Sequence, residues 1–463
     1  MADDVLDLAR PRRLHVTNVG GAGMSAIATL LAELGCDVSG HDPTEASPFL
    51  APLAALGVRV TTGTDASDLA GVELVITSTA TPEDHPDVVA ARAAGIEVHH
   101  RSAALAGLSR LRRTVAVAGT HGKTTTSALL ATVLDGAGAS PGFIVGASIA
   151  ALGRSATWGS DGPLVVEADE SDGSFLALAA YAAIVTNVEP DHLEHWGGEE
   201  QLRAGFEAFV AALEGPAVLC LDDPGAAALV GAARHAVTYG TDVASDYRLA
   251  DIATRGTGVR FTLHHGGESV AVEVPAAPGV HNARNAAAAL ALAHQLGIPL
   301  TAGATAIASF RGVARRFEQR GEAAGVVLVD SYDHLPTEVA AALAAARAGE
   351  WRRVVCCFQP HRYSRTQNLG ATFADAFTDA DVLAITGIYP AGEAPRPGVT
   401  GKIVVDAVLD AHPHQAVAWL PTLDDVVAYL GTTLREGDLC LTLGAGDLTS
   451  IPPRVLAALE ARR

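Results

Sequence analysis

Lysine is almost absent from this sequence: among 32 lysine and arginine residues, only Lys123 and Lys402 are lysines. Lys123 lies in the string Gly119-Thr-His-Gly-Lys-Thr-Thr125. A chain that otherwise relies on arginine needs a chemical reason to keep an ammonium group at this point. A compact ammonium on a flexible stem can follow a phosphoryl group during its transfer, which a planar guanidinium does less readily. The string therefore predicts a phosphate site.

Basic residues are also outnumbered, because 52 aspartates and glutamates give a net charge of −20. An acidic protein is not attracted to nucleic acid or to anionic membranes, so neither is expected as a partner. The five cysteines are scattered without a C-x-x-C pair, which indicates neither a disulfide framework nor a zinc site. The acidic start lacks the apolar segment of a signal peptide, and no apolar run is long enough to span a bilayer. We expect a soluble cytoplasmic protein, either a monomer or a weak homodimer.

Aromatic residues are scarce at 5%, whereas hydrophobic residues as a whole make up 49%. Short Val/Ile/Leu runs alternate with Ala-rich helical stretches, a pattern typical of α/β layers around parallel sheets. A chain of 463 residues is too long for one core and suggests about three domains of about 150 residues each. We expect a Rossmann-like N-terminal domain (1–108), a central domain with a mostly parallel sheet (109–312) and a Rossmann-like C-terminal domain (313–463). The predicted strands are 13–19, 37–42, 74–77, 97–99, 115–118, 164–168, 183–187, 217–221, 326–330, 353–358, 381–386 and 438–443, with hairpins in 240–275.

The lysine string follows a buried strand and precedes a helix, so its glycines lie in a strand-to-helix turn. Backbone N–H groups and the helix dipole make such a turn an anion site. The signature Gly119-x-x-Gly122-Lys123-Thr124 is two residues tighter than the generic nucleotide loop. We expect the Thr124 hydroxyl to hold Mg²⁺; the alternative is a glycine turn before an ordinary helix. The residues expected to bind the nucleotide here are Gly119, Thr120, His121, Gly122, Lys123, Thr124 and Thr125.

A second glycine turn, Gly21-x-Gly23-x-x-Ala26, opens a helix near the start of the chain. Asp42 follows it at the distance expected for a dinucleotide fingerprint. In this fingerprint the glycines have no Cβ atom, so the backbone can approach a diphosphate closely at a helix N-terminus. A nicotinamide cofactor and a UDP-sugar both fit this pattern, and so does an ordinary turn of a βα unit.

Polar residues follow several predicted strands. Glu167 closes one strand of the central domain and His192 follows the next. Because ligands gather at the carboxyl ends of strands in α/β sheets, these side chains are predicted to face the lysine loop and hold Mg²⁺. The alternative is a solvated acidic loop and a structural histidine.

Three further strings suggest roles from their residue types. His281-Asn-Ala-Arg-Asn285 is predicted to cap a long Ala/Leu helix. Arg315 and Arg316, at a domain boundary, could stabilise transferring phosphoryl oxygens or form an interdomain salt bridge. Arg362 and Arg365 are predicted to share one helical face and bind a carboxylate, the alternative being a basic helix start at the surface.

Several uncommon strings occur in a fixed order along nearly the whole chain. They are GGAGMS (20–25), AGTHGKTTT (118–126), EADESD (167–172), TNVEPDH (186–192), HNARNA (281–286), RRFE (315–318) and FQPHRYSRT (358–366). Together they resemble the Mur ligases.

The resemblance implies an ATP-dependent amide ligase that joins L-alanine to the carboxylate of UDP-N-acetylmuramate, through an acyl phosphate and a tetrahedral intermediate. It implies that Lys123 contacts the β- and γ-phosphates, that Thr124, Glu167 and His192 surround Mg²⁺, and that Asn282 and Asn285 lie near adenine. It implies Arg316 at the transferring phosphoryl group, Asp330 at the ribose, and His334, Arg362 and Arg365 near the amino acid. Lys123, His192, Arg316 and His334 are thus the expected catalytic residues. Gly20, Gly21, Ala22, Gly23, Met24, Ser25 and Asp42 are expected to hold the UDP-sugar.

The lysine count also bears on the branch of the family. Most Mur ligases carry a carbamylated lysine in the central domain, and the alanine-adding branch does not. No lysine lies between Lys123 and Lys402, which excludes that device and favours the alanine-adding branch. The string 330–338 departs from the family pattern at Ser331, Asp333 and Leu335. Another amino acid, a peptide or an inactive UDP-sugar-binding relative therefore stay open, as does a plain dinucleotide-binding oxidoreductase.

Overall fold

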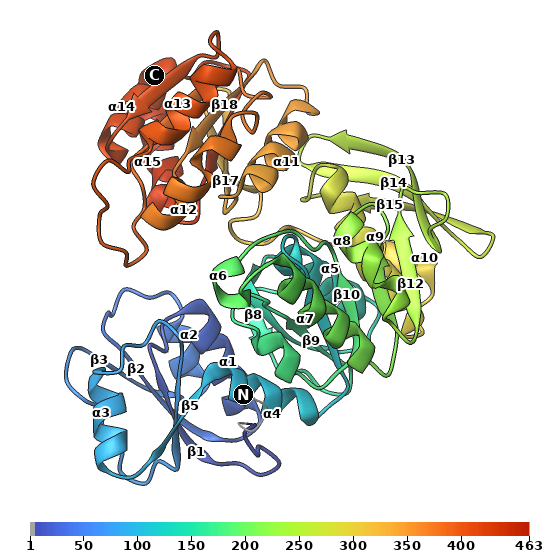
Figure 1. The fold of residues 1–463 in the computed structure, drawn as a ribbon, viewed down its shortest axis with the longest axis vertical. Helices are drawn as coiled ribbons and strands as arrows, with labels where there is room; N and C mark the ends of the chain where they lie inside the picture. The colour runs from blue at the N-terminus through green and yellow to red at the C-terminus, as the bar shows by residue number, and fades with distance from the viewer. Residues whose placement is uncertain (1–4, 463) are drawn as a thin grey trace. The chain divides into compact units, whose positions relative to one another are not determined.

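The computed structural model describes residues 5–462. The first four residues of the predicted N-terminal domain and Arg463 of the predicted C-terminal domain lie outside the described residues. In the described part, three β-sheets with flanking helices carry the fold (Figure 1). The chain divides into two compact units. The first runs to Ala250 and adds Leu263–Val270 and Arg284–Ser309; the second comprises Asp251–Thr262, Ala271–Ala283 and the chain from Phe310 onward.

The N-terminal sheet has five parallel strands in the order β3-β2-β1-β4-β5. Its strands are β1 Arg13–Thr17, β2 Asp37–Asp42, β3 Arg59–Thr62, β4 Leu74–Thr77 and β5 Glu97–His100, and its helices are α1 Ala22–Glu33, α2 Leu50–Ala55, α3 Pro86–Ala93 and α4 Arg101–Arg110. Four of the five strands lie where the sequence predicts them. The fifth, β3, is a mostly exposed edge strand and lacks an apolar run.

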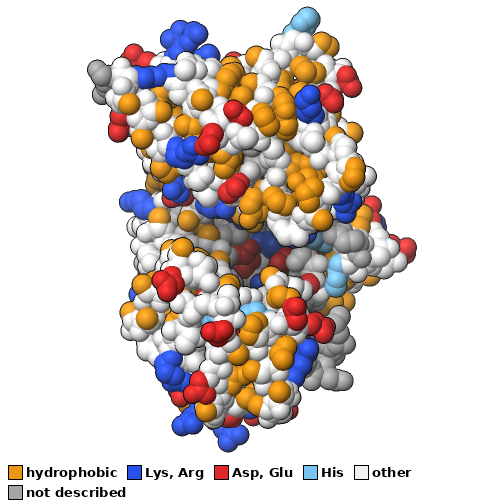
Figure 2. Space-filling view, turned by 90° about the vertical axis from the view of Figure 1, so that its left-hand side faces the viewer, with side chains coloured by type: hydrophobic (Ala, Val, Ile, Leu, Met, Phe, Trp, Pro, Cys, Tyr) orange, Lys and Arg blue, Asp and Glu red, His pale blue; other side chains and the backbone are white. Residues whose placement is uncertain are grey.

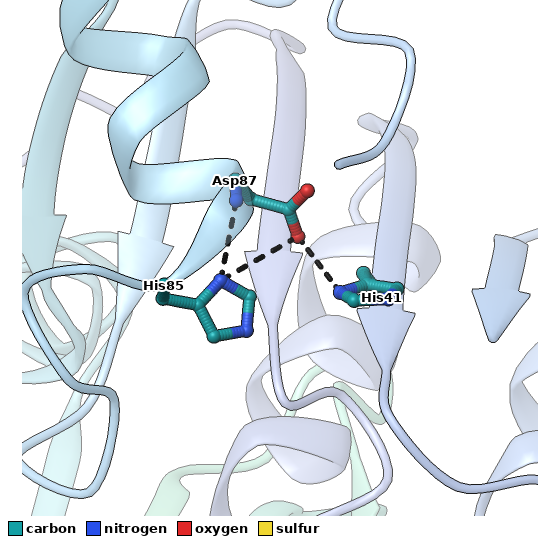
Figure 3. Close-up of side chains that lie close together, drawn as sticks. All are labelled: His41, His85 and Asp87. Carbon is teal, nitrogen blue, oxygen red and sulfur yellow. Dashed lines mark hydrogen bonds and ion pairs between the residues drawn. The ribbon is translucent and has the colours of Figure 1, made fainter. Parts of the chain in front are cut away.

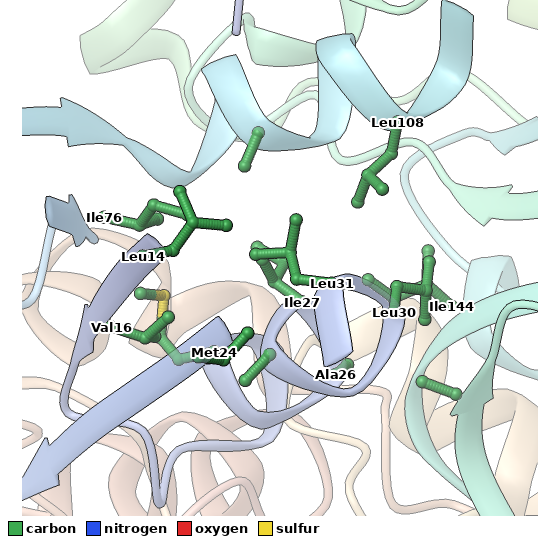
Figure 4. Close-up of a cluster of buried hydrophobic side chains, with 14 of the residues drawn as sticks. Leu14, Val16, Met24, Ala26, Ile27, Leu30, Leu31, Ile76, Leu108 and Ile144 are labelled. Carbon is green, nitrogen blue, oxygen red and sulfur yellow. The ribbon is translucent and has the colours of Figure 1, made fainter. Parts of the chain in front are cut away.

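Helix α1 is the centre of a core that extends beyond the N-terminal sheet. Its sequence, Ala-Gly-Met-Ser-Ala-Ile-Ala-Thr-Leu-Leu-Ala-Glu, has apolar side chains around most of its circumference. Ile27, Leu30 and Leu31 are at most 1% exposed. The same cluster includes Leu14 of β1 and Ile144 of the central sheet (Figure 4). A helix that is apolar on all sides is stable only when it is buried on all sides, and α1 meets this condition by packing between two sheets.

The central sheet has ten strands in the order β15-β14-β13-β12-β11-β10-β6-β9-β7-β8. The pairs from β13 through β7 are parallel, whereas the edge strand β8 runs antiparallel to β7. Its strands are β6 Thr114–Ala118, β7 Gly142–Ile149, β8 Arg154–Thr157, β9 Leu164–Glu167, β10 Ala180–Val185, β11 Ala217–Cys220, β12 Ala236–Gly240, β13 Tyr247–Arg255, β14 Gly258–His265 and β15 Glu268–Val274. Its helices are α5 Lys123–Gly136, α6 Leu193–Trp196, α7 Glu199–Ala212, α8 Pro224–Ala227, α9 Val280–Gln295 and α10 Leu300–Ile307, with 3₁₀ turns η1 Ser174–Ala177 and η2 Ala228–Gly231. The strand β6 before the lysine loop thus lies between β9, which ends at the predicted metal ligand Glu167, and β10, which precedes the predicted metal ligand His192.

The C-terminal sheet has six strands in the order β16-β17-β21-β18-β19-β20, parallel except for the β16–β17 pair. Its strands are β16 Glu318–Ala323, β17 Val326–Ser331, β18 Arg353–Phe358, β19 Val382–Thr386, β20 Val417–Leu420 and β21 Asp438–Leu443. Its helices are α11 Pro336–Arg347, α12 Tyr363–Leu369, α13 Lys402–Ala411, α14 Leu423–Thr433 and α15 Ile451–Glu460, with 3₁₀ turns η3 Gly370–Phe373 and η4 Asp447–Ser450. Buried apolar side chains cover both faces of this sheet, as expected where helices cover a parallel sheet.

The surface carries charges of both signs. Figure 2 shows acidic and basic side chains interspersed over the face that it draws. Among residues 5–462, no helix combines the length and the apolar character that a membrane span requires.

Candidate active site

The lysine loop connects the buried strand β6 to helix α5. Gly119 has φ +128° and Gly122 has φ +81°, values that favour glycine because a side chain would strain the backbone. At Gly119 a Cβ would also lie 2.2 Å from Thr186 Oγ1. Helix α5 begins at Lys123, so the N–H groups of its first turn point toward the loop. Thr124 and Thr125 are buried in that first turn. The loop therefore has the backbone shape of an anion site at a helix N-terminus.

The segment after β10 forms hydrogen bonds with this loop. His121 N donates to Asn187 Oδ1 at 2.8 Å, and Asn187 Nδ2 donates back to His121 O at 3.1 Å. Thr120 Oγ1 accepts from Glu189 N at 2.9 Å. On the other side, a Cβ at Gly122 would lie 2.9 Å from Asn285 Oδ1, so the Asn285 side chain of α9 lies against the loop. The loop is held in shape by partners from two other segments of the same unit, which fixes its amide groups before any ligand binds.

The Lys123 ammonium is buried against its own loop and against one carboxylate. Nζ lies 2.7 Å from Glu170 Oε2 and donates to Gly119 O at 2.7 Å and Thr120 O at 3.1 Å. Burial lowers the pKa of Lys123, but nearby carboxylates, above all Glu170, outweigh burial and raise that pKa above its ordinary value. For Glu170, burial raises the pKa against the opposing charge of Lys123. Lys123 therefore stays a cation at neutral pH and sits beside the turn that would receive phosphate.

Oxygen donors converge next to the lysine. Thr124 Oγ1 donates to Glu167 Oε1 at 2.8 Å, and Gly146 N donates to Glu167 Oε2 at 2.8 Å. A hydroxyl and a carboxylate in contact form an oxygen donor set of the kind that Mg²⁺ prefers, so these two residues fit that ion. His192 follows β10 and has φ +51°, and its Nε2 lies 3.4 Å from Asp191 Oδ2. Its role as a metal ligand stays a prediction.

The second glycine turn is tied to the end of β2. Asp42 Oδ2 accepts from Gly20 N at 2.8 Å, and Asp42 is 4% exposed. A Cβ at Gly20 would lie 2.6 Å from that carboxylate oxygen. Helix α1 begins at Ala22 with Gly21 as its N-cap, so its first turn holds Gly23, Met24 and Ser25. Asp42 thus holds the loop in place at the start of α1.

Arg101, which sequence reasoning missed, lies beside this turn. Its Nη1 would be 3.1 Å from a Cβ on Gly23, and its Nη2 lies 4.0 Å from Asp169 Oδ2. The guanidinium therefore lies between the start of α1 and the acidic segment that follows β9. No motif marked this residue, because it stands at the start of a helix with no glycine or acidic string around it.

In the second unit, aromatic and basic side chains form a cluster around His361. His334 lies 5.4 Å from His361 between ring centroids, and Arg365 Nη1 lies 3.1 Å from His361 Nδ1. Burial lowers the pKa of His334, and burial with neighbouring His334 and Arg365 lowers the pKa of His361 to about 3. His361, which the sequence did not single out, therefore contacts two of the predicted amino-acid-binding residues, His334 and Arg365.

Arg316 and Asp330 also lie in the second unit. The Arg316 guanidinium carbon is 4.8 Å from the Tyr332 ring centroid, a cation–π distance. Asp330 is 1% exposed and accepts from Thr442 Oγ1 and Thr449 Oγ1, each at 2.7 Å. The carboxylate of Asp330 has partners within its own unit, so its assignment to a ribose stays a prediction.

Two local predictions are wrong. Helix α9 begins at Val280, so the string 281–285 lies inside the first turns of the helix and does not cap it. Asn282 instead donates from Nδ2 to Pro278 O at 2.7 Å, while Asn285 lies one turn further. Helix α12 begins at Tyr363, and Arg362 precedes it with φ +66°, so Arg362 and Arg365 do not share a helical face. In both strings the residue types do not show which residue is the first of the helix, so the start of each helix could not be predicted to the residue.

The departures from the family pattern in the segment after β17 are accommodated locally. Ser331 Oγ donates to Asp333 Oδ2 at 2.6 Å and accepts from Phe317 N at 3.0 Å. Leu335 is 7% exposed and immediately precedes α11. The three unusual residues therefore form a consistent hydrogen-bonded and packed turn.

Family models match all three parts of the chain in order. The Mur ligase family catalytic domain matches residues 13–113, the Mur ligase middle domain matches 117–293 and the Mur ligase glutamate ligase domain matches 315–446. The chain belongs to the Mur ligase family. The α/β prediction with three domains and parallel-rich sheets is thereby confirmed.

Several curated full-length relatives are named UDP-N-acetylmuramate--L-alanine ligase. The chain is 45% identical over 456 residues to the UDP-N-acetylmuramate--L-alanine ligase of Anaeromyxobacter sp. (strain Fw109-5), covering 98% of this chain and 99% of that protein. It is 45% identical to the enzyme of that name from Myxococcus xanthus, covering 97% and 95%. Among solved structures, the UDP-N-acetylmuramate-alanine ligase of Thermotoga maritima matches with a TM-score of 0.82 and 28% identity, covering 98% of this chain and 100% of that one.

Proposed function

We propose that this chain uses ATP to join L-alanine to the carboxylate of UDP-N-acetylmuramate, a step in the synthesis of peptidoglycan precursors. The observation that carries the proposal is the identity of 45% with ligases of that name over 98% of the chain. The buried Lys123 ammonium beside a preformed anion turn supports the ATP-dependent part of the reaction. Since ATP and UDP-linked sugars are cytoplasmic metabolites, we place the enzyme in the cytoplasm.

In the proposed reaction, a carboxylate oxygen of the UDP-sugar attacks the γ-phosphorus of ATP, and ADP leaves. The amine of alanine then attacks the acyl carbon to give a tetrahedral intermediate, which collapses to the amide as phosphate leaves with the proton lost by the amine. Lys123 would neutralise charge on the transferring phosphoryl group, which requires it to exchange Glu170 for phosphate oxygens. Thr124, Glu167 and His192 would hold Mg²⁺, which supplies charge neutralisation at the phosphates.

The remaining roles are divided between the three proposed domains, 1–108, 109–312 and 313–463. The turn from Gly20 to Ser25, held by Asp42, would bind the diphosphate of the UDP-sugar at the start of α1. Arg101 would add a positive charge there, which an acidic protein must supply locally. In the C-terminal domain, Arg316 would meet the phosphoryl group, and His334, Arg362 and Arg365 would meet the amino acid. Asn282, Asn285 and Asp330 would contact the adenosine.

The amino acid is tested by measuring ADP formation with UDP-N-acetylmuramate and a panel of amino acids and short peptides. We expect the highest kcat/KM with L-alanine, lower values with glycine and L-serine, and background rates with either substrate omitted. A preference for a peptide, or ADP formation that ignores the amino acid, would contradict the assignment. No phosphate release with any pair would favour an inactive UDP-sugar-binding protein.

Gly20→Ala is expected to weaken UDP-sugar binding. The new Cβ would lie 2.6 Å from Asp42 Oδ2 and 2.8 Å from Ser47 Cβ, so the carboxylate must move away from Gly20 N. We expect KM for the UDP-sugar to rise about 10-fold, which corresponds to about 1.4 kcal/mol, with little change in KM for ATP. The matched control is Gly231→Ala, because a Cβ there would meet nothing within 4 Å. A rise in KM for ATP of the same size would show that the two loops are not separate sites.

A further inference from the structure

A cluster of buried polar side chains lies in the N-terminal sheet, outside the residues assigned above. His41 is the next-to-last residue of β2, His85 directly precedes α3 and Asp87 lies in its first turn, and the three side chains point toward one another (Figure 3). They are 2%, 8% and 0% exposed, respectively. Buried polar groups are stable only when each has a partner, so the contacts of each donor atom decide what the cluster can bind.

The two ring nitrogens of His41 face different oxygens. Nε2 lies 2.9 Å from Gly63 O, and because a carbonyl only accepts, this nitrogen carries a proton. Nδ1 lies 3.0 Å from Asp87 Oδ2, yet within the described residues it has no hydrogen bond of acceptable geometry. A nitrogen lone pair that faces a carboxylate is repelled by it. Either a second proton or a cation therefore belongs between His41 and Asp87.

His85 presents a second nitrogen donor. Its Nδ1 accepts from Asp87 N at 3.3 Å, so this nitrogen carries the lone pair of the ring, and a metal bound there would replace this long hydrogen bond at the start of α3. The same nitrogen lies 3.9 Å from Asp87 Oδ2. The donor atoms of His41, His85 and Asp87 all lie within 4.8 Å of one another.

We propose that His41 Nδ1, His85 Nδ1 and Asp87 Oδ2 form a binding site for a divalent transition metal of the zinc class. In a tetrahedral zinc site with bonds of about 2.0–2.1 Å, ligand atoms lie about 3.4 Å apart. The distances of 3.0 and 3.9 Å from Asp87 Oδ2 lie on either side of that value. Two imidazoles and one carboxylate suit zinc or cobalt better than magnesium, which prefers oxygen alone. A water molecule would complete the coordination.

Neighbouring groups orient the side chains of the cluster through hydrogen bonds, as is usual for metal ligands. Gly63 O fixes the tautomer of His41 that leaves Nδ1 free to bind a metal. His15 Nε2 lies 3.2 Å from Asp87 Oδ2, and Ser67 N donates to Asp87 Oδ1 at 2.6 Å. A metal here would tie α3 to β2 directly before Asp42, the residue that holds the Gly20 turn. The metal site is independent of the reaction proposed for the protein. Its ligands are histidine and aspartate, so the absence of a cysteine pair in the sequence does not bear on it.

The test is a cobalt titration of untagged, full-length protein that has been stripped of metal with a chelator and contains no nucleotide. We expect one equivalent of Co²⁺ to bind with the intense visible absorption of a tetrahedral complex, and Zn²⁺ to abolish that absorption. His85→Gln should remove the absorption. His15→Gln, which removes a positioning group, should weaken Co²⁺ binding about 10- to 100-fold.

Two matched controls separate this site from the proposed Mg²⁺ site and from surface histidines. His192→Ala and the exposed His235→Ala should both keep the absorption. If His85→Gln does not fold by circular dichroism, the wild-type protein still decides, through its zinc content and through a rise in Tm with Zn²⁺. Weak octahedral absorption, loss of the band in His192→Ala, or an unchanged band in His85→Gln would each overturn the proposal.

Discussion

Lys123→Met is expected to lower kcat by about 10³-fold or more, because an ammonium that neutralises a transferring phosphoryl group contributes on this scale. Methionine keeps the length of the side chain and removes its charge. The affinity for UDP-N-acetylmuramate should change little, since the Gly20 turn that would bind it belongs to a different sheet. Single-turnover ADP formation and calorimetric binding of the UDP-sugar measure the two quantities separately.

The burial of the Lys123–Glu170 pair complicates this experiment. Glu170 is 2% exposed and lies 2.7 Å from Nζ. Removing one member of a buried ion pair leaves an uncompensated charge, which typically costs about 3–5 kcal/mol of stability. The double variant Lys123→Met/Glu170→Gln removes both charges and should recover most of the stability while kcat stays low. Unfolding in urea, followed for the single and double variants, distinguishes loss of catalysis from loss of fold.

The chain offers a natural control, because Lys402 is its one other lysine. Lys402 is exposed at the start of α13. Lys402→Met should leave kcat and both KM values within about 2-fold of wild type, since surface substitutions are usually within about 0.5 kcal/mol. If Lys123→Met lost UDP-sugar affinity as strongly as turnover, the assignment of the loop to ATP would fail.

Glu167→Gln is expected to lower kcat by about 10²- to 10³-fold at ordinary Mg²⁺ concentrations, as the loss of a charged ligand weakens metal-assisted charge neutralisation. The amide oxygen of glutamine can still accept from Gly146 N, and its NH₂ group can donate to Thr124 Oγ1. The fold should therefore persist while the negative charge is lost. The apparent affinity for Mg²⁺ should fall with it.

The decisive measurement is the rate of ADP formation as a function of Mg²⁺ concentration. In Glu167→Gln the half-saturating Mg²⁺ concentration should rise about 10-fold or more, in line with the loss of a ligand, and high Mg²⁺ or Mn²⁺ should restore part of kcat. Glu207→Gln, an exposed change on α7, should behave as wild type. A uniform loss of activity that metal does not relieve would assign Glu167 a purely structural role through Thr124.

The fold was predictable from the sequence where strands are buried on both faces. Strand β6 and its neighbours are continuous apolar runs, and such runs are characteristic of the middle of a parallel sheet. The missed strands include β3, β8 and β20, all edge strands with exposed or half-exposed residues. Their place depends on hydrogen bonds to a neighbouring strand, which local composition does not encode.

The residues of the candidate site were predictable from the sequence, but the residues that they contact were less so. The lysine loop and the acidic string were found from residue types, and contact between Thr124 and Glu167 follows from strand order. Which carboxylate in the string meets Lys123 was not predictable, because Asp169, Glu170 and Asp172 follow the same strand with equivalent chemistry. His361 and Arg101 were missed because only the fold brings them to the predicted residues.

Helix α1 has a consequence for how this protein can be divided. Its first turn carries the proposed diphosphate turn, while Ile27, Leu30 and Leu31 also belong to a core that includes Ile144 and Val166 of the central sheet. Cutting the chain after residue 108 would expose side chains that each contribute about 1.5–3 kcal/mol by burial. A fragment limited to the first sheet would thus be prone to aggregate, and a chimera that exchanges this sheet between homologues would have to exchange the matching surface of the second sheet as well.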